Sequence, residues 1–332
     1  MQQKPFKFVK LFCQAMLFFL TLQMNLSFSQ TPFPSKPVTL IVPFPPGGAA
    51  EQPSRVISQA LLSVWNQATV VMSKPGAGGA IGASMVANAT PDGYTLMATN
   101  PSLLILPEAD RMFNRPAQFE LANFTPLALL VADPIVLVVK GDAPWKTFQE
   151  FASDAKNKPS EFTYGSSGAY SASHLPIEML ANAANIKLKH IPYSGGGPAI
   201  LALLGGHIAL TASSPAAVAT QIKAGTLRPL VVTGAKRVAA LPDVPTALEL
   251  GYKDAEFYLW IGLFGPAKMP EALVKSIRAD INKAVTQENG FNQSMSKLGA
   301  AADYRDGPAF ADFLSKDLAR IKATIQRIGK VD

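Results

Sequence analysis

The sequence predicts an α/β protein in which mostly parallel sheets are flanked by helices. Two observations indicate this fold class. Short apolar, β-branched segments alternate with helical patterns over most of the chain, an order typical of parallel sheets covered on both faces. The chain also has 332 residues, of which 48% are hydrophobic and 16% charged, and this length suffices for two domains with separate cores.

The first part of the chain alternates strands with helices. Strands are expected at 38–42, 68–72 and 94–98, and helices at 54–65 and 80–89. The first of these helices carries its apolar residues on one face: Val56, Ile57, Ala60, Leu61, Val64 and Trp65.

The middle of the chain continues this alternation. Strands are expected at 135–139, 162–164, 188–192, 208–211 and 227–232, and helices at 147–157, 173–184, 198–204 and 216–224. Two unbroken apolar stretches, 127–139 and 227–233, are suited to carry the chain between domains. The predicted domains are residues 30–131 together with 233–332, and residues 132–232.

The last part of the chain is predicted to be mainly helical, with helices near 270–286 and 290–298. Asp306 is the expected N-cap of a final helix that has Pro308 in its first turn. Its buried stripe consists of Phe310, Phe313, Leu314, Leu318, Ile321, Ile325 and Ile328. An aromatic group before these helices fits either a pocket wall or a core strand: Phe257, Tyr258, Trp260 and Phe264.

The N-terminus has the composition of a secretory signal peptide. Three lysines, at positions 4, 7 and 10, precede an interrupted apolar run that is shorter than the roughly 20 residues of a membrane span. Ser27 and Ser29 fit a cleavage site, so residues 1–29 are predicted to be removed and the mature chain to begin at Gln30 in the periplasm. The alternative is an N-terminal membrane anchor.

Charge and cysteine content exclude several functions. The net charge of +7 falls to about +4 without the three leader lysines, and no basic run marks a nucleic-acid surface. The single cysteine, Cys13, lies in the leader. The mature chain therefore has neither a zinc–cysteine site nor a catalytic thiol.

Four glycine-rich loops each follow a predicted strand and precede a predicted helix: 43–50, 76–80, 165–171 and 193–198. Ligands of open α/β sheets bind at the carboxyl ends of strands, where backbone N–H groups and helix N-termini attract anions. The first, third and fourth loops contain no Lys or Arg, so neutral donors would hold such an anion. Taken singly, each loop also fits an ordinary tight turn.

Enzyme templates fail. Ile81 breaks the dinucleotide-binding fingerprint, Ala169 breaks the serine-elbow pattern, and the three histidines lack metal-ligand spacing. The sequence therefore predicts no enzyme, cofactor or metal. The remaining alternative is a serine-dependent α/β enzyme using Ser167 and His174, which has no evident acid partner. His190 and His207 are expected to be structural.

Several motifs resemble those of the Bug-family solute-binding proteins, which serve tripartite tricarboxylate transporters. They are SKPVTLIVPFPPGG (35–48), KPGAGG (74–79), PDGYTL (91–96), YGSSG (164–168), SHL (173–175), PY (192–193), KAGTLR (223–228), AKR (235–237) and LPDVPT (241–246). The similarity spans about residues 35–325.

The resemblance implies a two-domain clamshell (a type II-like Venus flytrap) that binds a small carboxylate between its domains. The expected partners are that ligand and membrane transporter subunits, with the protein acting as a monomer and binding no nucleic acid. The ligand would be a di- or tricarboxylate, an amino acid or an aromatic acid. A periplasmic ligand sensor, which uses the same fold, is the alternative.

In the family, backbone amides, hydroxyls and waters of the loop after the first strand and of facing loops hold a ligand carboxylate. Loop positions and resemblance together predict a ligand site of Phe44, Pro46, Gly47, Gly48, Ala49, Ala50, Glu51, Gly78, Gly79, Ser102, Ser166, Ser167, Gly168, Ser171, His174, Tyr193, Ser194 and Ser213.

Two positions depart from the family pattern. Glu51 stands where the family often has Asp, and Ala209 replaces another frequent Asp. Glu51 either points to solvent and caps the first helix or accepts a hydrogen bond from a donor on the ligand. Both interpretations remain open at this stage.

Overall fold

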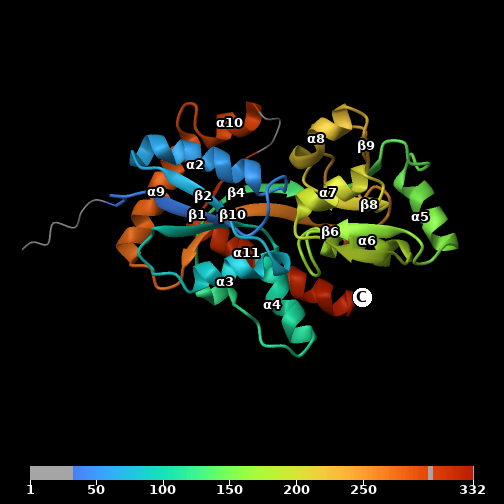
Figure 1. The fold of residues 1–332 in the computed structure, drawn as a ribbon, viewed down its shortest axis with the longest axis horizontal. Coiled ribbons are helices and arrows are strands. Elements are labelled where there is room, and N and C mark those ends of the chain that lie inside the picture. The colour runs from blue at the N-terminus through green and yellow to red at the C-terminus, as the bar shows by residue number, and fades with distance from the viewer. Residues whose placement is uncertain (1–32, 298–301, 332) are drawn as a thin grey trace, which may run out of the picture. The chain divides into compact units, whose positions relative to one another are not determined.

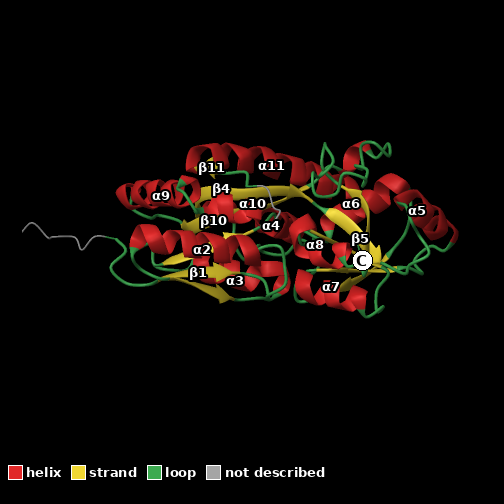
Figure 2. Ribbon diagram, turned by 90° about the horizontal axis from the view of Figure 1, so that it is seen from above, coloured by secondary structure: helices red, strands yellow, loops and turns green. Residues whose placement is uncertain are grey.

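Two mixed β-sheets organise the protein, and both lie within residues 36–332 (Figure 1). The computed structural model describes residues 33–297 and 302–331. The predicted signal peptide, residues 1–29, lies outside the described residues. Figure 2 shows the elements of the first sheet on the left and those of the second on the right.

The first sheet has the strand order β11-β4-β10-β3-β1-β2. Its strands are β1 (Val38–Val42), β2 (Thr69–Ser73), β3 (Thr95–Thr99), β4 (Phe124–Pro134), β10 (Tyr258–Pro266) and β11 (Arg305–Asp306). β1 pairs in parallel with β2 and β3, whereas β10 pairs antiparallel with β3 and β4. Its helices are α2 (Glu51–Trp65), α3 (Ala80–Ala87), α4 (Ser102–Met112), α9 (Glu271–Thr286), α10 (Phe291–Lys297) and α11 (Gly307–Ile328).

The second sheet has the strand order β7-β6-β8-β5-β9. Its strands are β5 (Val136–Lys140), β6 (Thr163–Ser166), β7 (Lys189–Pro192), β8 (Leu210–Ser213) and β9 (Leu227–Val232), and its helices are α5 (Phe148–Asn157), α6 (Leu175–Ala184), α7 (Gly196–Leu204) and α8 (Pro215–Lys223). β6 pairs in parallel with β7 and β8, and β5 pairs antiparallel with β8 and β9. Three short 3₁₀ helices, η2 (Ala77–Gly79), η3 (Leu121–Asn123) and η4 (Lys253–Ala255), lie in connections.

The α/β class is confirmed, but the sheets are mixed and not mostly parallel. Each sheet combines parallel strands joined by helical crossovers with long antiparallel pairs formed by strands distant in sequence. The chain leaves the first sheet at the end of β4, at Pro134, and enters the second at Val136. The predicted domain boundaries, after residues 131 and 232, remain a prediction.

The aromatic residues Phe257, Tyr258, Trp260 and Phe264 lie on or next to β10, and this strand belongs to the protein core. Trp260 and Phe264 are fully buried and contact Phe310 of α11 edge-on and tilted, respectively. The Trp260 indole N–H donates to the buried Asp317 carboxylate at 2.8 Å, which satisfies both groups inside the core. The predicted cap of α11 is confirmed, because Asp306 accepts a 2.6 Å hydrogen bond from the Gly307 N–H.

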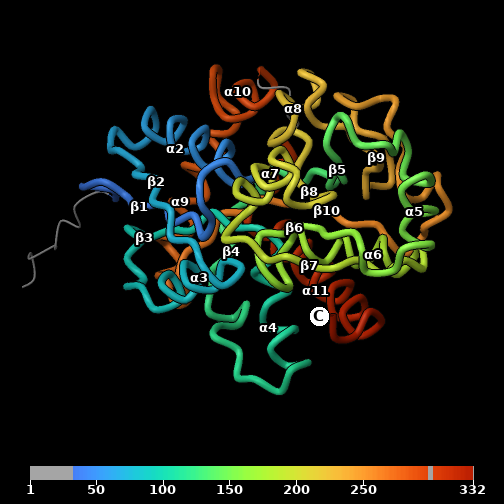
Figure 3. Tube along the Cα trace, turned by 45° about the vertical axis from the view of Figure 1, so that its right-hand side comes forward, coloured from blue at the N-terminus to red at the C-terminus, as the bar shows by residue number. Residues whose placement is uncertain are grey.

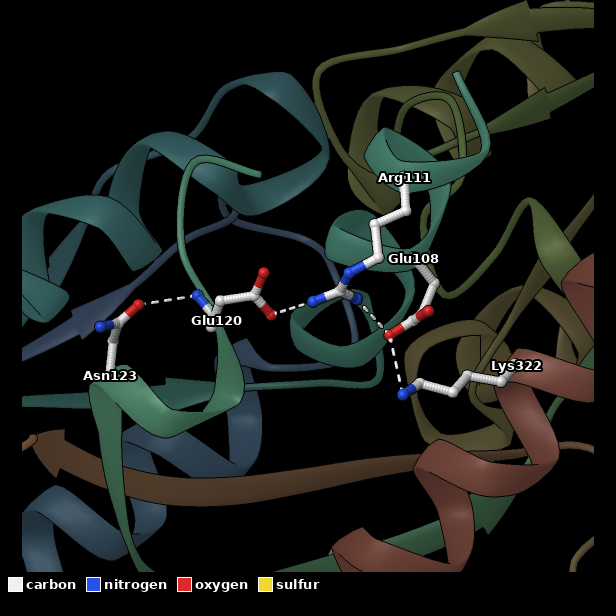
Figure 4. Close-up of polar contacts among 5 residues, drawn as sticks. All are labelled: Glu108, Arg111, Glu120, Asn123 and Lys322. Atoms are coloured by element: carbon white, nitrogen blue, oxygen red, sulfur yellow. Dashed lines mark hydrogen bonds and ion pairs between the residues drawn. The ribbon is translucent and has the colours of Figure 1, made fainter. Parts of the chain in front are cut away.

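Helix α11 lies between α4 and α6 (Figures 1 and 3). An ion-pair network joins it to α4: Arg111 contacts both Glu108 and Glu120, and Lys322 of α11 lies 3.6 Å from Glu108 (Figure 4). In the same network the Glu120 N–H donates to the Asn123 side chain at 2.7 Å. Helix α11 is thus attached to the first sheet by both apolar and ionic contacts.

Over residues 33–297 and 302–331, every helix is too short or too polar to cross a lipid bilayer.

Candidate functional site

Five strand-to-helix junctions converge on one small cavity. Those after β1, β3, β6, β7 and β8 each contribute residues to its lining, and each is followed by a helix of nine residues or more. The cavity, called here the inner cavity, measures about 30 Å³. Its lining consists of Phe44, Gly48, Ala49, Ala50, Asn100, Ser167, Ala172, Ser173, Gly196, Ala212, Ser213 and Leu259.

A second cavity of about 160 Å³, called here the outer cavity, adjoins the first and shares Gly48, Ala49 and Leu259 with it. Its remaining lining comprises Gly47, Glu51, Gln52, Pro53, Val131, Asp133, Ser214, Ala216, Ala217, Thr220, Gln221, Ile261 and Met295. These residues come from α2, β4, α8, β10, α10 and the loops before α2 and α8, so both sheets contribute to it.

The polar side chains of the inner cavity are all neutral: Asn100, Ser167, Ser173 and Ser213. The Ser173 hydroxyl accepts a 2.8 Å hydrogen bond from the Ser167 N–H and lies 2.9 Å from the Ser167 hydroxyl. The Asn100 carboxamide accepts from the Ser102 N–H at 2.9 Å. Among the described residues, the lining of the two cavities includes no Lys or Arg. Helix N-termini and neutral donors therefore set the electrostatics of the inner cavity.

Glycines allow segments of the first sheet that border the hollows to contact segments of the second sheet; these are called here the two sides. A Cβ on Gly197 would lie 2.5 Å from the Pro46 carbonyl oxygen, and one on Gly47 would lie 3.3 Å from the Gly197 Cα. A Cβ on Gly168 would lie 3.0 Å from the Gly78 Cα. The loops after β1 and β2 thus contact the first turn of α7 and the loop after β6, respectively, at distances that leave little or no room for a side chain.

One hydrogen bond also crosses between the two sides. The Ser102 hydroxyl, at the start of α4, accepts from the Ala172 N–H at 3.0 Å. Ser102 is almost fully buried, so its hydroxyl contributes to closure and not to the surface of either cavity.

Glu51 is directed at its own loop. Its carboxylate accepts a 2.6 Å hydrogen bond from the Gly47 N–H and a 2.9 Å ion pair from Arg55. The Gly47 N–H, with a smaller contribution from Arg55, lowers the pKa of Glu51. The negative charge lies in the first turn of α2, but the carboxylate accepts from the loop residue Gly47 and not from a helix N–H, and Glu51 lines the outer cavity. The role of Glu51 toward the ligand therefore stays a prediction.

Next to the inner cavity, the rings of His174 and His190 contact each other in a tilted arrangement with centroids 4.1 Å apart, and Tyr164 stacks on both. The Tyr170 N–H donates to His174 Nδ1 at 2.9 Å, and the Ser166 hydroxyl lies 2.7 Å from His190 Nε2. Burial lowers the pKa of His174 to about 3, with a smaller effect from His190, and lowers that of His190 to about 4. Both rings are therefore neutral at physiological pH.

The structure brings together part of the predicted site. The inner cavity receives Phe44, Gly48, Ala49, Ala50, Ser167 and Ser213, and the outer cavity receives Gly47 and Glu51 together with the shared Gly48 and Ala49. A separate groove receives Gly78, Gly168 and Tyr193. The lining of these three hollows does not include Pro46, Gly79, Ser102, Ser166, Ser171, His174 or Ser194.

Sequence reasoning missed several lining residues: Asn100, Asp133, Ser173, Ser214 and Leu259. A signal existed for Asn100, which directly follows a predicted strand. Asp133 was detectable as the single acid in the apolar stretch 127–139.

The serine–histidine pair considered for an enzyme does not form. The Ser167 hydroxyl meets Ser173, while His174 Nδ1 accepts a backbone N–H. Within the described ranges, no group of three His, Cys, Asp or Glu side chains is arranged to hold a metal ion.

Two α/β sheets with a site between their strand ends define a periplasmic-binding-protein fold, and solved structures agree. The structure of the periplasmic binding protein BugD is 29% identical, with a TM-score of 0.82 over 90% of this chain and 99% of that chain. MatC from Rhodopseudomonas palustris with bound malate is 27% identical, with a TM-score of 0.82 over 88% and 100% of the two chains. An R. palustris protein with adipate is also 27% identical, with a TM-score of 0.82 over 90% and 98%.

The family follows from sequence comparison. Residues 54–330 match the family described as the tripartite tricarboxylate transporter family receptor. The UPF0065 protein in the tcbD-tcbE intergenic region of Pseudomonas sp. strain P51 is 35% identical over 290 residues, 87% of this chain and 85% of that protein. The chain belongs to this receptor family, as the Bug-family resemblance predicted. Because the family consists of solute-binding receptors, the protein is not an enzyme.

Proposed function

We propose that this protein captures a small carboxylate in the inner and outer cavities and delivers it to a membrane transporter. The observation that carries the proposal is that residues next to the starts of five helices line the inner cavity, with the N-cap of α2, Ala50, and the first residue of α7, Gly196, in the lining itself. Each N-terminus presents unsatisfied N–H groups and a partial positive charge, so together they stabilise an anion that no Lys or Arg contacts.

The dimensions support a ligand that occupies both cavities. About 30 Å³ accommodates a carboxylate head or one to two waters, because a water needs on the order of 10–15 Å³ of such space. The rest of the ligand would extend into the adjoining 160 Å³. Malate and adipate, bound by two similar proteins, are dicarboxylates of different length, which supports a shared carboxylate end with variable remainders.

Ligand entry requires the glycine contacts to separate. We infer that the domains, bounded after residues 131 and 232, open about the segments that join the two sheets and close on the ligand. The closing contacts are Gly197 against Pro46 and the hydrogen bond between Ser102 and Ala172.

The family's name supports delivery to a tripartite tricarboxylate transporter, and the N-terminal composition supports export to the periplasm. We expect a monomer that binds no nucleic acid. N-terminal sequencing of periplasmic protein should begin at Gln30, and membrane-bound protein that retains Met1 would contradict export.

Calorimetric titration with carboxylates tests ligand capture, with uncharged amides of the same skeletons as controls. We expect carboxylates to bind and amides not to bind. Ser167→Ala should weaken binding by about 1 kcal/mol, the value of one neutral hydrogen bond. Ser171→Ala is the matched control, because Ser171 is buried in the same loop but lies outside the cavity lining. Equal effects of the two variants, or amide binding, would place the site elsewhere.

A further inference from the structure

Asp133 stands on the floor of the outer cavity among apolar side chains. Within the antiparallel pair of β4 and β10, Asp133 is opposite Leu259 and Val131 is opposite Ile261. Residues two apart on a strand share a face, so these four side chains point to the same side of the sheet, and all four line the cavity. Met295 of α10 adds a further apolar wall.

No described residue forms an ion pair with the Asp133 carboxylate. Among the described residues, no hydrogen bond or ion pair to its side chain is formed. The nearby Asp303 is neutralised by Arg305, which donates to both of its oxygens at 3.1 and 2.7 Å. Burial, and secondarily Asp303, raises the pKa of Asp133 to about 6. An unpaired carboxylate in apolar surroundings is costly unless a partner arrives with the ligand.

Among the described residues that line the outer cavity, Glu51 is the only titratable side chain besides Asp133. Helix α2 contributes Glu51, which is held by Gly47 and Arg55, while α8 contributes neutral Thr220 and Gln221. The N-terminal turns of α2 and α8 also reach the outer cavity, but its lining carries the acids Asp133 and Glu51, whereas the lining of the inner cavity contains no acid. Leu259, the strand partner of Asp133, lines both cavities. A single small molecule can therefore occupy the inner cavity and extend to Asp133 in the outer cavity.

We propose that Asp133 binds an ammonium group of the ligand, so that the solute is an amino acid whose carboxylate occupies the inner cavity. This inference rests on the proposed function and narrows its ligand class. The competing arrangement is a protonated Asp133 that donates to the second carboxylate of a dicarboxylate. At neutral pH most Asp133 side chains are ionised, which favours the ammonium.

Matched ligand pairs that differ only by an amino group test the proposal. Calorimetry at pH 7.5 compares aspartate with succinate, glutamate with glutarate, and 4-aminobutyrate with butyrate. We expect at least one amine-bearing member to bind about tenfold or more tightly than its partner. Asp133→Asn should remove this preference by weakening the amine-bearing ligand about 10- to 100-fold, the range for hydrogen bonds to charged groups.

Asp312→Asn is the matched control, because it removes an exposed acid of α11 that lies outside both cavities and should leave the amine preference intact. A second measurement needs no variant: binding of the amine-bearing ligand to wild-type protein should weaken as the pH falls through 6, because Asp133 loses its charge. A dicarboxylate that binds more tightly below pH 6, and equally well to Asp133→Asn, would overturn the ammonium assignment.

The outcomes separate the two proposals. If no carboxylate binds wild-type protein, the proposed function fails. If carboxylates bind but amine-bearing and amine-free partners bind alike, or if Asp133→Asn leaves the preference unchanged, only the assignment of Asp133 fails.

Discussion

The carboxylate of Glu51 accepts a hydrogen bond from the N–H of Gly47, four residues earlier, at 2.6 Å. This bond closes the loop after β1 onto the first turn of α2, where a negative charge is also stabilised by the helix dipole. The acid thus shapes the loop that borders both cavities.

Replacing this acid tests whether it organises the loop or selects the ligand. Glu51→Gln keeps an acceptor oxygen but loses the charge, so we expect a small loss of stability, about 0.5–1 kcal/mol, and a uniform weakening of all ligands. Chemical denaturation and titration of a ligand panel measure the two effects. Unequal shifts between amine-bearing and amine-free ligands would show that Glu51 selects.

We expect the proposed domain closure to depend on the absence of a side chain at Gly197. Gly197→Ala should favour helix α7, since alanine is about 1 kcal/mol better than glycine in helices, but its methyl group would meet the Pro46 carbonyl at 2.5 Å. We therefore expect unchanged or higher thermal stability with ligand affinity reduced at least tenfold. Leu201→Ala, at a position of the same helix that is 69% exposed, is the control. Full affinity in Gly197→Ala would show that this contact is not needed for binding.

The buried histidine pair predicts acid sensitivity. The folded-state pKa values of His174 and His190, about 3 and 4, lie below the ordinary value near 6.5. As the pH falls below 6.5 the unfolded chain therefore binds protons that the folded chain cannot, and stability is lost by up to about 1.4 kcal/mol per pH unit for each ring. Asp133, whose pKa is raised to about 6, and Glu178, whose pKa is raised mainly by burial, oppose this trend, because the folded chain takes up their protons at higher pH than the unfolded chain.

Urea denaturation between pH 4.5 and 7.5 measures this slope. His174→Asn and His190→Gln replace the nitrogens that contact Tyr170 and Ser166 by amide groups, so the double variant should show a shallower slope. The exposed His207→Gln is the control. Identical slopes in the wild-type protein, the double variant and His207→Gln would assign the acid sensitivity to other groups.

Local patterns predicted the parallel parts of both sheets, because each strand there is followed by its own crossover helix. They did not predict the pairing of β4 with β10, whose residues are more than a hundred positions apart. Helix α4 was missed because Pro107 lies inside it and its first turns resemble an apolar stretch. Tertiary packing, not local propensity, forms that helix.

The same limit applies to the site. Sequence position identified the loops but not which serine of each loop faces the cavity. Neighbouring Ser166 and Ser167 have opposite roles, since one contacts His190 and the other lines the inner cavity. Asp133 could not be placed, because its position depends on the register that pairs it with Leu259.

The place of β10 within the first sheet has a consequence for biosynthesis. This strand lies between β4 and β3, yet it is made more than a hundred residues after both. Until it emerges, the earlier strands of that sheet form two separate groups with open edges, whereas all five strands of the second sheet are already present. During synthesis the first sheet therefore stays divided until residues 258–266 have been made, so its completion comes later than that of the second sheet.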